Sequence, residues 1–194
     1  MPAPDKPAGD NHGRSSPALS QSNSVKDTIA SRKIAILAAD GVDSSDIAAV
    51  GDALTGAGAT CEVLAARDGT LQAANGSRIE VTRALPTVAS VLYDAVVVPG
   101  GERAARTLSG DGGALHFIAE AFKHGKAVGA IGDGAALLPL AHVRGLQPNG
   151  DGVTADRGVV VAEASGDHAE FNHELVQAVA RHRHWDRAIE AVPA

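Results

Sequence analysis

The feature that most constrains the fold is a series of short apolar runs separated by segments with helical periodicity. The runs are too short for core helices, and their continuous apolar character is typical of strands covered on both faces of a parallel sheet. They lie at 33–39, 60–65, 93–98, 126–131 and 158–162. Helices are predicted between them and after the last one, over 44–55, 113–124, 134–140 and 167–182. This alternation predicts an α/β fold with a mainly parallel sheet and helices on both faces.

Two further segments depart from this alternation. Residues 1–31 contain Pro2, Pro4, Pro7 and Pro17 and almost no large apolar side chains. Such a segment cannot bury enough apolar surface to offset its ordering entropy, so we expect a linker or arm followed by one domain over 32–194. Between 70 and 81, the pair Asn75-Gly76 predicts a β-hairpin.

Composition excludes several classes of function. The net charge is -6 and the basic residues are scattered, which argues against a nucleic-acid surface. No apolar run approaches the ~18 residues of a membrane span, and the N-terminus shows no signal-peptide core, so a cytoplasmic protein is expected. The single cysteine, Cys61, excludes an internal disulfide and a cysteine-based zinc site, and its strand context predicts an inert buried thiol.

Cofactor motifs are also missing from the chain. Neither the pair His168 and His173 nor the pair His182 and His184 has the i,i+4 spacing of helical metal ligands, so no metal site is predicted. No glycine-rich phosphate-binding loop follows the first strand. No cofactor is therefore expected in this chain.

Three turns follow strands and should meet at one edge of the sheet. They are Asp40–Asp46, Pro99–Arg103 and Gly132–Gly134. Ligands of open α/β sheets bind beyond the carboxyl ends of the strands, so these turns form the candidate site.

The same turns carry a family resemblance. The segments Ala39-Asp40-Gly41-Val42-Asp43, Val97-Val98-Pro99-Gly100-Gly101 and Ala130-Ile131-Gly132-Asp133-Gly134 resemble turns of the intracellular-protease and class I glutamine-amidotransferase-like superfamily. A narrower resemblance, to the linker and C-terminal domain of large-subunit haem catalases, extends over nearly the whole chain after residue 15. It includes Arg32-Lys33-Ile34-Ala35-Ile36-Leu37 and Ala180-Arg181-His182-Arg183-His184-Trp185-Asp186.

The resemblance implies a flavodoxin-like three-layer sandwich with a non-catalytic role. In such a catalase the domain follows the haem core and supports the stability or assembly of a peroxide-degrading homotetramer. A variant of this hypothesis gives the domain a chaperone-like role. Its implied partners are the core domain and the other subunits. Haem is expected only in a full-length parent, because Tyr93, the one tyrosine, is predicted to be a core or sheet-edge residue.

The implied site residues indicate lost chemistry. Catalytic relatives carry a cysteine at the turn after the fourth strand, where this chain has Gly132, followed by Asp133. Asp46 matches the family's acid, and Gly100 and Gly101 match the oxyanion turn. Asp133 is interpreted as a helix N-cap, and we expect all five residues to be vestigial.

An alternative keeps the cleft active. In that hypothesis the chain is a stand-alone amidotransferase-like enzyme or a small-molecule binder, and Asp46 and Asp133 act in a remodelled cleft.

Overall fold

A computed structural model describes residues 16–19, 23, 26–144, 152–163, 168–187, 189 and 192. The strands are β1 (Lys33–Leu37), β2 (Thr60–Ala65), β3 (Gly69–Gln72), β4 (Arg78–Val81), β5 (Arg83–Ala84), β6 (Ala95–Val98), β7 (Ala127–Ile131), β8 (Val153–Asp156) and β9 (Val159–Ala162). The helices are α1 (Ser44–Gly56), α2 (Glu102–Ser109), α3 (Gly112–Lys123), α4 (Leu137–Leu140) and α5 (Ala169–Ala180). Short 3-10 turns are η1 (Pro17–Leu19), η3 (Leu85–Thr87), η4 (Ser90–Leu92) and η5 (Gly132–Ala136).

Within the described residues, seven strands form one sheet in the order β5-β2-β1-β6-β7-β9-β8. All neighbouring strands are parallel except β8, which pairs antiparallel with β9. The central strands β1, β6 and β7 are almost entirely buried, as their continuous apolar sequences predict.

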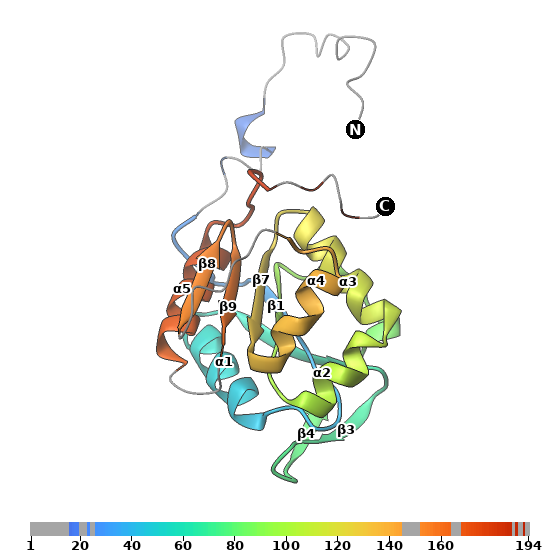
Figure 1. Cartoon of the computed structure of the whole chain (residues 1–194). Coiled ribbons are helices and arrows are strands. Elements are labelled where there is room, and N and C mark those ends of the chain that lie inside the picture. The colour runs from blue at the N-terminus through green and yellow to red at the C-terminus, as the bar shows by residue number, and fades with distance from the viewer. Residues whose placement is uncertain are drawn as a thin grey trace.

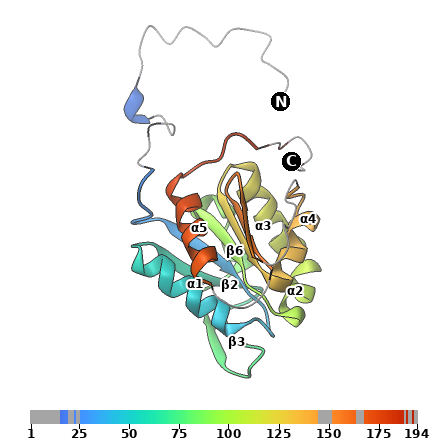
Figure 2. The same ribbon diagram turned by 60° about the vertical axis from the view of Figure 1, so that its left-hand side comes forward.

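Helices cover both faces of this sheet, and two apolar cores separate the layers. Helices α1 and α5 lie on one face, where Phe171 and Leu175 are fully buried against Ile34 and Ile36. Helices α2, α3 and α4 cover the other face, where Ile118 and Leu137 contribute to the second core. Figure 2 shows the three layers, and the predicted flavodoxin-like sandwich is confirmed.

The predicted hairpin forms a small separate sheet. Strands β3 and β4 pair antiparallel around Asn75-Gly76. The Ala73 N–H donates to the Ser77 carbonyl at 2.9 Å. This bond closes a connection that is longer than the two-residue turn that Asn-Gly most often makes.

Several boundaries differ from the sequence predictions. Helix α2 and strand β8 were not predicted, and β6 begins two residues later than the apolar run suggests. The domain also begins before residue 32, because Ile29 is buried and the Ser31 N–H donates to the Gly58 carbonyl at 2.9 Å. The rest of the expected arm, apart from residues 16–19, 23 and 26–28, lies outside the described residues.

The two ends of the sheet have different roles. The carboxyl edge carries the turns after β1, β6 and β7, next to the β3–β4 hairpin. The opposite end, called here the amino edge, consists of residues 31–33, 90–95, 125–126 and 182–187. There the chain enters β1 and leaves α5 (Figure 1).

Candidate functional site

The three predicted turns do meet at the carboxyl edge, where they surround a cleft of about 420 Å³. Its lining is rich in carboxylates and glycines: Asp43, Asp46, Gly100, Gly101, Ile131, Gly132, Asp133 and Glu163. All five residues that the sequence analysis assigned to the site are therefore in one place. Glu163, which follows β9, was not predicted.

Asp46 is the most constrained side chain of the cleft. It lies in the first turn of α1, which begins after Asp43, an N-cap residue that accepts the Ser45 N–H at 2.9 Å. The Asp46 carboxylate is fully buried. Its Oδ2 accepts the backbone N–H of Gly100 at 2.7 Å, and its Oδ1 lies 2.7 Å from Nε2 of His168.

The His168 contact is one that sequence reasoning missed. His168 precedes α5 and was considered only as a metal ligand, a role for which its spacing was unsuitable. The structure instead places its nearly buried ring against Asp46, 122 residues earlier in the chain. No local pattern signals this pair, because it depends on α1 and α5 lying on the same face of the sheet.

Burial dominates the ionisation of Asp46. It raises the pKa of the carboxyl above its ordinary value, and the neighbouring negative charge of Asp43 acts in the same direction. The Gly100 hydrogen bond and His168 oppose this shift, since both favour the carboxylate. Asp46 is thus a satisfied buried group, held from two sides.

The elbow after β7 offers no nucleophile. Gly132 adopts φ +50°, a left-handed conformation that is costly for residues with a Cβ, and the nearest atom to an added Cβ would be 3.9 Å away. Asp133 is exposed and does not cap the following turn, whose N-cap is Ile131. The N-cap interpretation of Asp133 is therefore wrong: the residue lies inside the turn.

The oxyanion turn is tightly enclosed. Gly101 has φ +113°, and a Cβ there would be only 2.3 Å from the Gly41 carbonyl oxygen, so a glycine is required. The Gly100 N–H, one of the two amides that could donate to an oxyanion at this turn, is already bound by Asp46. A substrate oxygen would have to displace a buried carboxylate to reach it.

Tyr93 does not fit a haem ligand. It is buried, its hydroxyl donates to Glu62 Oε2 at 2.6 Å, and its ring centroid lies 5.6 Å from that of Phe117. Burial and the Glu62 carboxylate raise its pKa, whereas an axial phenolate must be deprotonated. The residue is a core side chain, as predicted.

Other site classes find little support in the described parts of the chain. Cys61 lies in β2 beside the α1–α5 core, and burial raises the pKa of its thiol. The described side chains include no group of three or more His, Cys, Asp or Glu arranged to hold a metal ion. None of the described helices has the length and apolar character to cross a membrane.

Solved structures place this architecture in a known class. The fold is similar to that of a variant of the Schizosaccharomyces pombe DJ-1 protein, with a TM-score of 0.70 and 17% identity over 75% of this chain and 90% of that one. A two-domain protein of Anabaena variabilis with DJ-1/ThiJ/PfpI-like and ferritin-like domains gives a TM-score of 0.71, at 20% identity, over 84% of this chain and 52% of that one. The class is the class I glutamine-amidotransferase-like fold.

Sequence comparison identifies the family within this class. The family model for the C-terminal domain found in long catalases matches residues 30–189, and the chain belongs to that family. It is 44% identical to the catalase HPII of Mycobacterium avium over 100% of this chain and 28% of that protein. For the catalase HPII of Pseudomonas aeruginosa the identity is 39%, over 92% of this chain and 24% of that protein. The chain thus spans about a quarter of the length of these relatives.

Proposed function

We propose that this chain is a non-catalytic domain that supports the stability or assembly of a peroxide-degrading haem catalase. A variant of the proposal gives the domain a chaperone-like role toward that enzyme. One feature of the cleft carries the proposal: its elbow residue is Gly132, and the Asp46 carboxylate accepts the backbone N–H of Gly100 in the oxyanion turn. A cleft arranged in this way has no nucleophile at the elbow, and one of the two amides of its oxyanion turn is already bound.

The partners follow from the family. The chain corresponds to about a quarter of the long catalases it matches, so the proposed partners are the haem-binding core of such an enzyme and the other subunits of a homotetramer. Haem would be held by that core and not by this chain. We propose a cytoplasmic setting, which is compatible with the single cysteine, because small secreted domains are commonly rich in disulfides.

The test uses the Mycobacterium avium relative. Its catalase HPII would be prepared without the segment that this chain matches, and as a chimera in which this chain replaces that segment. Catalase activity should survive heating longer in the chimera, and tetramers should persist at lower protein concentration. Equal inactivation rates and equal dissociation in the two proteins would contradict the proposal.

A second candidate is a small-molecule or amidotransferase-like activity in the remodelled cleft. The observation that favours it is the buried Asp46–His168 pair, an arrangement that can hold a proton beside a cleft of about 420 Å³. In that case the wild-type chain should turn over a hydrolase or glyoxalase substrate, and either Asp46→Asn or Asp133→Asn should abolish the turnover. Absence of turnover in a broad substrate screen would exclude this candidate.

A further inference from the structure

The amino edge carries the most exposed large apolar side chains of the described residues. Val91 and Leu92, in η4, are 78% and 57% exposed, and Trp185 is 64% exposed. The two segments that carry these side chains are both hydrogen-bonded to the residues that precede β7. Lys126 Nζ donates to the Ser90 carbonyl at 2.5 Å, and the His184 N–H donates to the Gly125 carbonyl at 2.7 Å.

Trp185 is held outward by buried neighbours on both sides. His184 is buried, and its Nε2 lies 2.9 Å from the Ala178 carbonyl oxygen. Arg187 is buried as well and donates to the carbonyl of Phe122 at 3.0 Å. An exposed tryptophan on a segment fixed in this way loses little entropy on binding, which is the character of an interface anchor.

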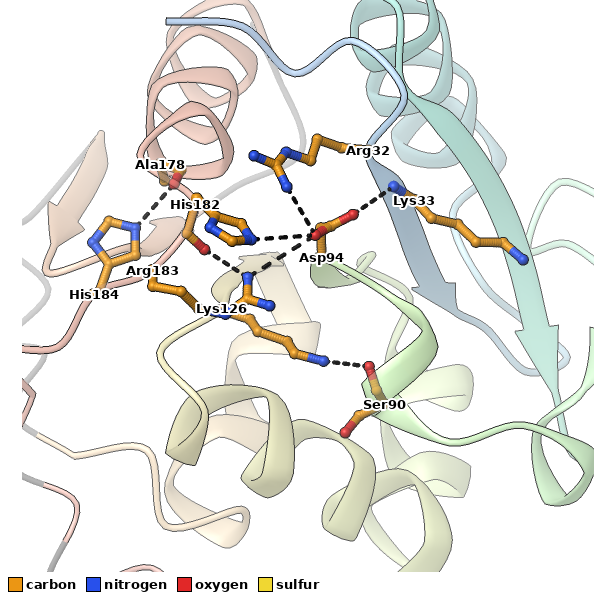
Figure 3. Close-up of polar contacts among 9 residues, drawn as sticks. All are labelled: Arg32, Lys33, Ser90, Asp94, Lys126, Ala178, His182, Arg183 and His184. Atoms are coloured by element: carbon orange, nitrogen blue, oxygen red, sulfur yellow. Dashed lines mark hydrogen bonds and ion pairs between the residues drawn. The ribbon is translucent and has the colours of Figure 1, made fainter. Parts of the chain in front are cut away.

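The same edge contains a cluster of cations around one carboxylate (Figure 3). Asp94 accepts the backbone N–H of Lys33 at 3.0 Å and lies 3.4 Å from Nη1 of Arg32. Arg183 and His182 approach it only to 3.9 Å. Asp94 therefore engages its arginines through long, single contacts and not through a bidentate pair.

Lys126 adds a buried positive charge to this cluster. Its ammonium donates to a backbone carbonyl, and no carboxylate of the described residues lies within ion-pair distance of it. Burial, and next the charge of Arg183, lower the pKa of Lys126 to about 8. The carboxylates of Asp94 and Glu120 act on this pKa in the opposite direction. At neutral pH Arg32, Arg183 and Lys126 still outnumber these two carboxylates, so the cluster favours a further anionic group.

We propose that the amino edge is the face by which this domain docks on the preceding part of a long catalase chain. Trp185, with Val91 and Leu92, is the apolar anchor, and an acidic side chain of that part binds beside Arg32 and Arg183. This inference rests on the proposed function and specifies the surface through which it operates.

The path of the chain before β1 and the charges at the two edges both favour a preceding catalase domain as the occupant. The matched family is a C-terminal domain, and the matched relatives are about four times longer than the chain. The segment that leads into β1 runs along the amino edge, where Arg32 contacts Asp94. A preceding domain would meet this edge first. The opposite edge instead presents the carboxylates of Asp133 and Glu163.

Hydroxyl-radical footprinting of the chimera described above tests the docking face. Oxidation of Trp185 would be compared between the isolated chain and the chimera, and we expect it to fall to the rate of a buried side chain. Leu140, 50% exposed on the face of α2, α3 and α4, is the matched apolar control and should keep its rate. Unchanged oxidation of Trp185, with protection around Asp133 and Glu163, would overturn the proposal.

Single substitutions separate the contribution of the apolar anchor to heat resistance from that of the charged cluster. Trp185→Ser and Arg32→Gln, made in the chimera, should each remove most of the gain in heat resistance, whereas Leu140→Ser and Arg106→Gln should not. Melting of the isolated variants shows whether they still fold. Full heat resistance in both Trp185→Ser and Arg32→Gln would refute this docking face while leaving the proposed function intact. A wild-type chimera no more stable than the truncated catalase would instead refute the proposed function.

Discussion

The backbone N–H of Gly100 donates to the buried carboxylate of Asp46 at 2.7 Å, so a side chain of the domain itself occupies its oxyanion turn. The contact joins the first turn of α1 to the loop after β6. His168 closes the other side of the same carboxylate. The buried Asp46 carboxylate therefore links α1 both to the loop after β6 and to the residue that precedes α5.

Introducing a cysteine at the elbow should destabilise the domain without creating an enzyme. Gly132→Cys places a Cβ at φ +50° and should cost about 1 kcal/mol, a loss of about 2–4 °C in melting temperature. The thiol should react with iodoacetamide. No hydrolase activity should appear, because Asp133 lies at the position where protease relatives often have a histidine that assists the cysteine. Gly132→Ala is the control and should lose similar stability through the backbone alone. An unchanged melting temperature in both variants would contradict this account.

The stability contribution of Lys126 should depend on pH. Its pKa is lowered from 10.5 to about 8, so between these values the unfolded chain binds more protons than the folded one, and wild-type stability gains as pH rises. Lys126→Met has no such titration. Urea unfolding at pH 7 and pH 10.5 should therefore show the wild type gaining up to about 3 kcal/mol relative to the variant. A difference that does not change with pH would mean that Lys126 is not desolvated.

Tyr93 should matter for stability and not for haem. Tyr93→Phe removes the hydrogen bond to Glu62 and should cost about 1 kcal/mol in urea unfolding. Glu62 keeps its ion pairs with Lys33 at 2.8 Å and Arg83 at 3.2 Å, which limits the loss. Reconstitution of the wild-type chain with haem should give no stoichiometric Soret band and no peroxide turnover. A Soret band that Tyr93→Phe abolishes would reverse this interpretation.

Limited proteolysis should locate the start of the domain. The composition of residues 1–31 predicts that a protease cuts readily within this segment. The cut should stop before Ile29, because that side chain is buried and the Arg32 N–H donates to its carbonyl at 3.0 Å. Mass spectrometry of the resistant fragment measures the boundary. Protection of the whole N-terminal segment in the isolated chain would show that it docks on the domain.

The sequence predicted most of the sheet because the buried strands are continuous apolar runs. Strand 60–65 was confirmed at both ends, and helix α3 to within one residue. Helix α2 was missed because it is only 8 residues long and because its buried side chains are small apart from one leucine: they are Ala104, Ala105 and Leu108. Strand β8 was missed because Val153–Asp156 is short and half-exposed.

The candidate site was predicted in its turns but not in its contacts. The positions of Asp46, Gly100 and Gly132 followed from the family resemblance and from the rule that strand ends meet at one edge. The pairing of Asp46 with His168 could not be predicted, since it depends on how α1 and α5 lie together. The amino-edge cluster escaped notice for the same reason: its charges come from four separate segments of the chain.

The length of one edge strand affects how copies of the domain can meet. On one side the sheet ends in β5, a strand of two residues. An exposed edge templates the addition of another strand only when it offers several consecutive unpaired N–H and C=O groups. β5 is too short to provide them. Where the sheet ends in β5, the domain therefore offers little template for continuous sheet formation between molecules.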